Sequence, residues 1–413
     1  MNEYEQISFF PADILLPDKT DMTKWSVVAC DQYTSQPDYW EDVSDIVGDC
    51  PSAFNLVLPE LYLNDKNVDE KIALINKNMD DYLNNILKEY KNSYLYVERT
   101  LNNGKVRKGI VGAVDLESYE FEPGNNAMIR ATEGTVSERI PPRVRVRQNA
   151  SLELPHVMLL IDDKNNVVFN SVEKAEKVYD FELMKNSGHL KGWIIKNNDA
   201  VADSLLKLLN NNSDRNGTML YAVGDGNHSL ATAKACWENI KKSSVNVKNH
   251  PARYALVEIE NIHDEALEFE PIHRIVFNCD SSDLLNELDN YCGVSEEKIE
   301  NAQEIQYVIN RKVTKLYIEK PTSNLAVGTL QGFLDSYIAK NNCEIDYIHG
   351  ADVVKQLSEK ENSIGFLLPS MDKSDLFATI IKDGILPRKT FSMGEACDKR
   401  FYVEARRIIP EDK

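Results

Sequence analysis

One strand–turn–helix segment constrains the fold of this chain more than any other feature. Residues 219–223 form a short apolar run, Gly224-Asp225-Gly226 follows it, and residues 229–242 have helical periodicity. A strand that passes through a glycine turn into a helix is typical of α/β proteins, in which helices cover a sheet. Helices and strands alternate in other parts of the chain as well, so the sequence predicts an α/β protein with mixed α+β elements.

Composition and charge exclude several classes of protein. The chain has 413 residues, 42% of them hydrophobic, which is enough to bury a large core without disulfides. Its net charge of −19 repels nucleic acid and anionic membranes, so neither is expected as a partner. Residues 1–10 lack the apolar core of a signal peptide, and no run has the length of a membrane helix. The scattered cysteines form no CxxC pair, which favours a cytoplasmic protein with reduced thiols.

Periodicity and turn residues predict the remaining elements. Helices are expected at residues 69–90, 200–210, 284–291, 302–311, 330–340 and 374–383, and strands at 106–121, 253–259, 270–277, 315–319 and 363–368. Residues 157–161 and 167–169 are expected to pair as a β-hairpin through the turn 162–166. The pattern changes near residue 280, so we expect a core of residues 1–280 that carries the chemistry and a C-terminal α/β region of residues 281–413.

The turn from Gly224 to Ser229 suits an anion. The first turn of a helix has unpaired N–H groups and a partial positive charge, and glycines let a ligand approach the backbone. Asn227 or Ser229 is expected to cap the helix. Asp225 stands at the carboxyl end of the strand, where a metal ligand or general base is found in open α/β sheets. His228 adds a donor or proton carrier. An ordinary glycine turn with an asparagine cap remains the structural alternative, since no P-loop motif is present.

Residues 123–155 are rich in arginine, which is unusual in so acidic a chain. The arginines are Arg130, Arg139, Arg143, Arg145 and Arg147. On a strand, residues 143, 145 and 147 would share one face, and guanidinium groups match phosphate oxygens in bidentate fashion. Glu133 lies among them and could position an arginine, bind magnesium or take a proton. If the Asp225 turn binds phosphate, these arginines should converge on it. The alternative is a solvated basic arm that pairs with the acidic bulk.

Together these segments resemble the domain of unknown function 1015 family. Residues 225–233 are similar to its Asp-Gly-His-His-Arg-x-x-x-Ala box, with Asn227 in place of the first histidine and Ser229 in place of the arginine. The other parts of the resemblance are Asp31, the element Arg130-x-x-Glu133-x-Thr135 with Arg139 nearby, Pro-Ile-His-Arg at 271–274 and Leu-Pro-Arg-Lys at 386–389. The box is also similar to that of the ParB/sulfiredoxin-like superfamily, whose members bind nucleotides and some of which phosphorylate free serine.

The resemblance implies a ParB/sulfiredoxin-like nucleotide-binding core that uses ATP or ADP with Mg²⁺. The implied reaction is phosphoryl transfer to a small hydroxyl acceptor, foremost free L-serine. The nucleotide phosphates are assigned to Gly224, Gly226, Asn227 and Ser229, and Arg274 is a further cofactor-binding residue. Asp225 is expected to bind Mg²⁺ or activate the hydroxyl, with Glu133 as second candidate base, and Arg130, Arg139 and Arg143 to neutralise the phosphoryl group. His228, also a catalytic candidate, and His273 are expected to orient phosphate oxygens, and Asp31 to bind the acceptor amino group. A phosphohydrolase using the same pocket and a non-catalytic nucleotide sensor are the alternatives.

Overall fold

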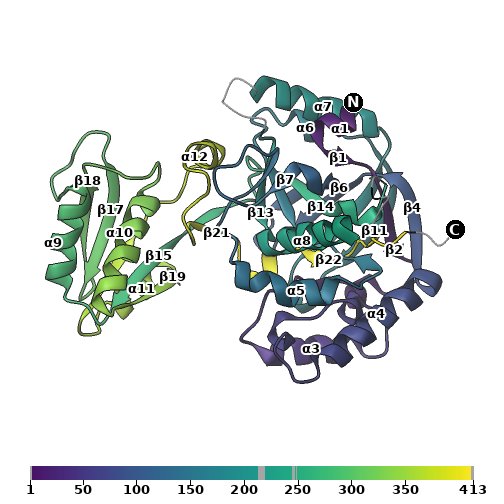
Figure 1. The fold of residues 1–413 in the computed structure, drawn as a ribbon, viewed down its shortest axis with the longest axis horizontal. Helices are drawn as coiled ribbons and strands as arrows, with labels where there is room; N and C mark the ends of the chain where they lie inside the picture. Colours follow the sequence, from purple (N-terminus) through teal and green to yellow (C-terminus); the bar gives the residue numbers. More distant parts are fainter. Residues whose placement is uncertain (1, 213–218, 244–246, 248, 411–413) are drawn as a thin grey trace. The chain divides into compact units, whose positions relative to one another are not determined.

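The fold consists of two units, each built on a sheet of its own. The structure is a computed structural model that describes residues 2–212, 219–243, 247 and 249–410. Unit 1 comprises Met1–Leu267 and Gly394–Lys413, and unit 2 comprises Glu268–Met393 (Figure 1). Both units combine helices with sheets, so the predicted mixed α/β class is confirmed.

The division of the chain differs from the predicted boundary near residue 280. The chain leaves unit 1 after Leu267 and returns to it at Gly394. Two short pairings hold the returning segment: β22 (Phe401–Tyr402) pairs with β3 (Val27–Val28), and β23 (Arg406–Arg407) pairs with β9 (Leu152–Glu153). These partners are far apart in the sequence, so local patterning could not reveal the return.

The central sheet of unit 1 is mixed and has ten strands within the described residues. In order across the sheet they are β11 (Lys174–Glu182), β12 (His189–Ile195), β5 (Leu95–Thr100), β6 (Val106–Asp115), β14 (Tyr254–Asn261), β10 (Met158–Ile161), β13 (Tyr221–Asp225), β8 (Ile129–Ala131) and β7 (Tyr119–Glu120), while β1 (Phe9–Phe10) pairs with β6. β13 runs antiparallel to β10 and parallel to β8, and β10 runs parallel to β14. Strands from four separate parts of the sequence therefore meet around β13.

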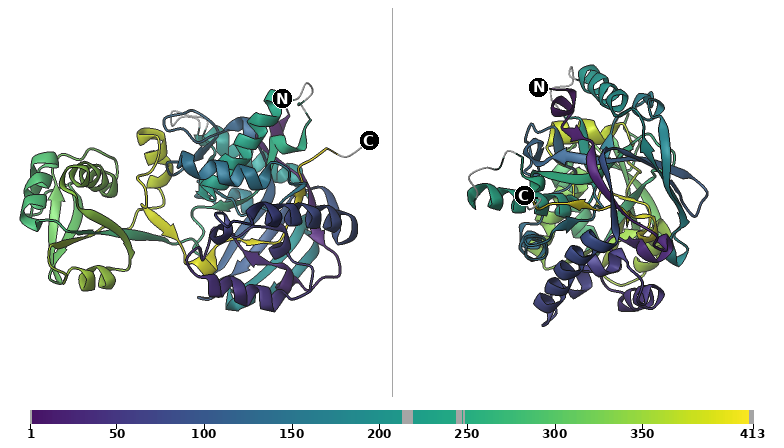
Figure 2. Two further views of the ribbon diagram at one scale, coloured as in Figure 1. Left: turned by 60° about the horizontal axis from the view of Figure 1, so that its bottom comes forward. Right: turned by 90° about the vertical axis from the view of Figure 1, so that its right-hand side faces the viewer.

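Helices cover both faces of this sheet, because its strands carry apolar side chains on alternating sides. One face packs against α3 (Pro37–Val47) and α4 (Val68–Asn85), and the other against α7 (Asn198–Asn212) and α8 (Asn227–Ser243), as Figures 1 and 2 show. The remaining helices of unit 1 are α1 (Glu3–Ile7), α2 (Met22–Trp25), α5 (Ile140–Arg147) and α6 (Val167–Asn170), and a further two-stranded sheet pairs β2 (Ala12–Pro17) with β4 (Leu87–Ser93). Buried residues of α4 recur at helical spacing: Val68, Ile72, Ile75, Met79 and Tyr82.

Three predictions for unit 1 are wrong in instructive ways. The expected β-hairpin at 157–169 does not form, since Asp163 accepts a hydrogen bond from the Val168 N–H at 2.8 Å and the turn opens helix α6. The predicted helix at 69–90 ends at Asn85, where strand β4 takes over. Residues 140–147 form helix α5, begun by two prolines, and the arginines there do not share a strand face.

Unit 2 is a second layered α/β unit with an antiparallel sheet. Its strands are β16 (Val294–Ser295), β18 (Lys312–Ile318), β17 (Gln303–Ile309), β20 (Ser363–Leu367), β15 (Phe269–Phe277) and β19 (Glu344–His349), with β21 (Phe391–Met393) paired to β15. Its helices are α9 (Ser281–Cys292), α10 (Ala326–Asn341), α11 (Ala351–Leu357) and α12 (Asp375–Asp383). The predicted helix at 302–311 is wrong: these residues form β17, whose buried Ile305 and Val308 are three residues apart, a spacing that a helix also shows.

No helix within the described ranges is long and apolar enough to cross a membrane.

Candidate active site

The turn between β13 and α8 is tight because strand β10 passes close to it. Asp225 is the last residue of β13, and Gly226 has a φ of +80°, which favours glycine. A Cβ atom at Gly226 would lie 3.0 Å from the Cα atom of Val157, so a larger residue would displace that segment. The Gly226 carbonyl accepts the first helical hydrogen bond, from the Leu230 N–H at 3.0 Å. Gly226 therefore occupies the N-cap position, which had been predicted for Asn227 or Ser229.

The segment that follows β8 is held against this turn by hydrogen bonds. The Asn227 amide oxygen accepts from the Thr132 N–H at 3.2 Å, and the Thr132 hydroxyl donates to the Val223 carbonyl at 2.7 Å. Further along, the Val136 N–H donates to Nε2 of His228 at 3.2 Å. Glu133 lies in the chain between these two attachments. The turn and the 132–136 segment thus form one wall of the site.

His228 is neutral in this setting. Burial, together with the charges of Arg143 and Arg139, lowers its pKa to about 4. Nε2 accepts the Val136 N–H, so the ring proton is on Nδ1, which can donate to a phosphate oxygen. Because the Val136 N–H occupies Nε2, only Nδ1 is available for the predicted role of orienting a phosphate oxygen.

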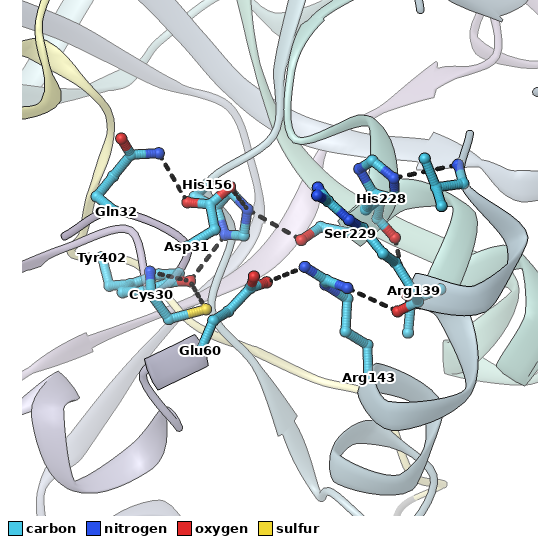
Figure 3. A network of polar contacts seen from close by, with 12 residues as sticks. Cys30, Asp31, Gln32, Glu60, Arg139, Arg143, His156, His228, Ser229 and Tyr402 are labelled. Carbon is cyan, nitrogen blue, oxygen red and sulfur yellow. Dashed lines mark hydrogen bonds and ion pairs between the residues drawn. The ribbon is translucent and has the colours of Figure 1, made fainter. Parts of the chain in front are cut away.

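Two of the predicted arginines reach this wall. Arg143 on α5 donates to the Arg139 carbonyl at 2.6 Å and forms an ion pair with Glu60. Figure 3 shows the Arg139 guanidinium pointing toward His228 and Ser229, and the side chain of Arg139 is exposed. Helical geometry turns residues two positions apart by about 200°, so Arg145 faces away from Arg143, whereas Arg147, four positions from Arg143, lines the same cavity. Arg145 pairs with Asp69, and Arg147 pairs with Glu153 at 2.5 Å.

Arg130 is on strand β8, opposite Ala222 of β13, and is almost completely buried. Its Nε donates to the Ala127 carbonyl at 2.9 Å. Burial lowers the pKa of its guanidinium, and one buried terminal nitrogen has no hydrogen-bond partner among the described residues. Arg130 therefore lies one strand away from Asp225, and its role in ligand binding stays a prediction.

Asp225 is paired with a lysine from the returning C-terminal segment. Lys399 Nζ lies 3.4 Å from Asp225 Oδ2, and the Gly226 N–H donates to Oδ1 at 3.0 Å. Lys399 also acts on Asp31: burial raises the pKa of that carboxyl, but His156, Gln32 and Lys399 outweigh the effect, and the pKa lies below its usual value. Two carboxylates predicted from the sequence thus share one cation.

A chain of hydrogen bonds centred on His156 completes the site (Figure 3). His156 Nε2 lies 2.9 Å from the Ser229 hydroxyl, and Nδ1 lies 2.8 Å from the Tyr402 hydroxyl. The Tyr402 hydroxyl donates to the Cys30 sulfur at 3.1 Å. Burial, followed by the charge of Asp31, raises the pKa of the Cys30 thiol to about 12, so this thiol is protonated.

A cavity of about 160 Å³ opens beside these groups. Its polar lining includes Cys30, Glu60, Arg143, His156, Ser229 and Tyr402. The rest is mainly aliphatic, from residues such as Leu58, Leu63, Met79, Val146 and Leu256. An apolar cavity with a few convergent polar groups is the usual form of a small-molecule site.

Magnesium fits this site only in company with a ligand. Within the described residues no group of three or more His, Cys, Asp or Glu side chains could hold a metal ion. Mg²⁺ commonly takes one or two carboxylates and completes its shell with phosphate oxygens and water. Asp225 can supply one such carboxylate, so the donor set matches a metal that arrives with nucleotide phosphates.

His273 and Arg274 belong to unit 2 and are engaged within it. Arg274 is fully buried and donates to Gln331 at 3.1 Å and to the carbonyls of Lys389 and Arg388, both at 2.9 Å. His273 Nδ1 accepts from the Leu368 N–H at 3.2 Å. The Arg274 donors thus bind the Gln331 side chain and backbone carbonyls of unit 2, and its cofactor-binding role stays a prediction.

Several residues of the site were missed by sequence analysis, notably His156, Lys399, Tyr402 and Glu60. His156 enters the site because β10 pairs with β13 in a register that places Met158 opposite Asp225. Lys399 and Tyr402 enter through the pairing of β22 with β3. The only local signal was the position of His156 directly before an apolar strand.

Comparisons with known proteins place the chain in a family. The sequence profile described as Protein of unknown function (DUF1015) matches residues 11–337. No curated protein is similar to the chain. Among solved structures, a free serine kinase in complex with AMP is similar at 10% identity, with a TM-score of 0.39 and coverage of 71% of this chain and 90% of that chain. A conserved hypothetical protein from Pyrococcus furiosus has 10% identity and a TM-score of 0.37, over 72% of this chain and 94% of that one. These TM-scores are too low to bear on the chemistry of this chain.

Proposed function

We propose, for this chain that belongs to the family described as Protein of unknown function (DUF1015), the function of a nucleotide-dependent phosphotransferase. The name of the family assigns no reaction, so the proposal rests on the residues of the site. The observation that carries this proposal is a cluster of four groups around the β13–α8 turn and the cavity beside it. They are the N-terminus of α8, the arginines 139 and 143, the Asp225–Lys399 pair and the Asp31–His156 pair, and of their residues Ser229, Arg143 and His156 line the cavity.

The charges of the pocket suit a phosphorylated ligand. Two guanidinium groups and the free N–H groups of the α8 N-terminus attract phosphate oxygens. Neutral His228 offers an N–H donor without adding charge, since its pKa is lowered to about 4. The aliphatic lining of the 160 Å³ cavity suits the nucleobase, the least polar part of a nucleotide.

Phosphoryl transfer needs positioned charge and a base, and the pocket offers both. We assign charge neutralisation to Arg139, Arg143 and Lys399. Asp225, which ends β13 and pairs with Lys399, would hold the nucleotide's Mg²⁺. His156 Nε2, now bonded to Ser229, can take the proton of an acceptor hydroxyl. Glu133 is the second candidate for the base.

For the acceptor we propose free L-serine, as the family resemblance implies. Asp31 is partly exposed, and its pKa lies below the usual value, so it is ionised at neutral pH and can bind an ammonium group. Its Oδ2 lies 3.9 Å from His156 Nε2. An acceptor whose amino group is held by Asp31 would therefore present its hydroxyl near the proposed base.

The test is a product assay on the full-length protein with Mg²⁺ and either ATP or ADP, over a panel of amino acids. Formation of O-phosphoserine supports the proposal, while release of inorganic phosphate without an acceptor product indicates a phosphohydrolase. Binding without turnover, seen as a rise in melting temperature alone, indicates a nucleotide sensor.

A pair of variants on α5 controls for charge. Arg143→Ala should weaken nucleotide binding about 10- to 150-fold, because a charge-assisted contact to phosphate contributes roughly 1.5–3 kcal/mol. Arg145→Ala removes the same charge two residues away, where the side chain pairs with Asp69, and should bind nucleotide as the wild type does. Equal affinities for both variants would remove Arg143 from the site.

A further inference from the structure

Ser229 is held in the geometry of an activated nucleophile. Its hydroxyl lies 2.9 Å from Nε2 of His156, a histidine that is only 5% exposed. The base is itself oriented by a third group, since Nδ1 lies 2.8 Å from the Tyr402 hydroxyl. A hydroxyl, a neighbouring base and a group that orients the base form the arrangement on which nucleophilic serines depend.

The hydrogen bonds fix the ring proton on the side that this chemistry requires. The Tyr402 hydroxyl donates its proton to the Cys30 sulfur and accepts the Cys30 N–H at 3.2 Å. Its remaining lone pair can accept a hydrogen bond from an Nδ1–H of His156, and we infer this tautomer for the ring. Nε2 is then unprotonated, and the Ser229 hydroxyl donates to it.

The surroundings of Ser229 favour a phosphorus electrophile. Ser229 lines the cavity and lies in the first turn of α8, where N–H groups stabilise negative charge. The Arg139 guanidinium points toward Ser229 and His228 (Figure 3). Asp31, with Oδ2 at 3.9 Å from His156 Nε2, stabilises the imidazolium that forms when the base takes a proton.

We propose that Ser229 is a covalent catalytic residue, which accepts the phosphoryl group from the nucleotide and passes it to the acceptor. This inference rests on the phosphotransferase function proposed above and names its route. In the first half, Ser229 Oγ attacks the terminal phosphorus of the nucleotide and an Oγ–P bond forms. The bond from phosphorus to the bridging oxygen breaks, and its electron pair stays on the nucleotide. The Ser229 hydroxyl proton moves to His156 Nε2. In the second half, the acceptor oxygen attacks the phosphoserine, the Oγ–P bond breaks, and His156 returns its proton to Oγ. The acceptor proton is released to solvent, because His156 already holds the Ser229 proton on this route; His156 would take the acceptor proton itself only in a direct transfer.

The alternative is a purely structural role, in which the Ser229–His156 hydrogen bond only holds α8 against the segment that leads into strand β10. The two interpretations differ in reactivity, because a structural serine does not react with electrophiles at neutral pH.

The first experiment treats the full-length protein with an alkyl fluorophosphonate and maps the adduct by peptide mass spectrometry. We expect a single adduct on Ser229, lost in Ser229→Ala and slowed about 10²–10⁴-fold in His156→Gln, since glutamine cannot take the proton. Ser243→Ala, at the far end of the same helix, should be labelled as fast as the wild type. Absence of an adduct on Ser229, or equal labelling of His156→Gln, would overturn the proposal.

The second experiment separates this route from the function on which it rests. With Mg²⁺-ATP and no acceptor, the wild type should gain one phosphoryl group on Ser229, which added L-serine then removes. If Ser229→Ala makes O-phosphoserine at the wild-type rate, the covalent route is wrong and the kinase function stands. If the fluorophosphonate labels Ser229 but no nucleotide reacts, the activated serine stands and the proposed phosphotransferase function is wrong.

Tyr402→Phe tests the orienting role without removing the ring. It should slow labelling of Ser229 while leaving the KM for nucleotide unchanged, because Tyr402 acts through His156. A change in KM with an unchanged labelling rate would instead make Tyr402 part of the binding surface.

Discussion

The site at the β13–α8 turn of unit 1 and strand β15 of unit 2 each bring a histidine together with an arginine, yet they use the arginine in opposite ways. Arg274 in unit 2 is fully buried, and its donors bind Gln331 and backbone carbonyls near residue 388. Arg139 in unit 1 is exposed and points toward the Ser229 pocket (Figure 3). A cation whose donors are taken up by the protein's own backbone stabilises the fold, whereas one that faces a cavity can bind an anion.

The histidines of the two regions are, by contrast, alike. Burial lowers the pKa of both His228 and His273 to about 4, and each accepts a backbone N–H, from Val136 and Leu368 respectively. A lowered histidine pKa therefore does not by itself separate a binding site from a structural position. The distinction lies in what surrounds the ring.

The largest effect should come from the carboxylate of the turn. Asp225→Asn keeps the size and turn preference of the side chain but loses the charge that faces Lys399, so turnover should fall about 10²–10⁴-fold with little change in stability. Initial rates of product formation and the melting temperature measure the two effects.

The matched control for this variant is Asp280→Asn in unit 2. Asp280 caps α9 by accepting from the Ser282 and Asp283 N–H groups, and asparagine caps a helix about as well. Its activity should equal that of the wild type. If Asp225→Asn were equally active, the centre of the chemistry would move to Asp31 or Glu133.

The next effect should be structural and should appear in unit 2. Arg274→Met leaves several buried carbonyls without donors, each at a cost of about 1–3 kcal/mol, so unfolding should require roughly 3 kcal/mol less. Urea unfolding of the full-length variant measures this loss, and nucleotide affinity at low denaturant should be unchanged. A stable variant that no longer bound nucleotide would restore the predicted ligand-binding role of Arg274.

Local sequence patterns revealed the elements of this comparison better than their surroundings. The strand, turn and helix at residues 219–242 were predicted close to their observed bounds, because an apolar run and a glycine turn are local signals. The helix at 140–147 was missed, since its two prolines and alternating arginines obscure helical periodicity. The strand at 303–309 was taken for a helix because its buried side chains recur every third residue.

The candidate site was predictable only where it is continuous in sequence. Asp225 and His228 were identified from their own segment, Arg139 and Arg143 from the arginine-rich segment 123–155, and Asp31 through the family resemblance. His156 and Lys399 come from positions far along the chain, joined to the turn by strand pairing that no periodicity reveals. Burial also determines the roles of Arg274 and Arg139. Packing between segments that are distant in the sequence decides which of the two guanidinium groups is available to bind a ligand.

The smallest expected effect is on the pH dependence of folding stability, to which His228 and His273 should contribute alike. Each has an ordinary pKa of 6.5 when unfolded and about 4 when folded, so between these values the unfolded chain binds more protons. The stability contribution of each neutral histidine is therefore complete above 6.5 and is lost as the pH falls toward about 4. Denaturant unfolding of wild type, His228→Gln and His273→Gln at about pH 7 and about pH 5 should show that both variants lose less stability in acid than the wild type does.

Bound nucleotide should then separate the two regions. Phosphate beside His228 favours its charged form, so nucleotide should reduce the acid loss in the wild type and in His273→Gln more than in His228→Gln. If nucleotide protected all three proteins equally, the phosphate would lie away from His228, and the difference between the two regions would rest on the arginines alone.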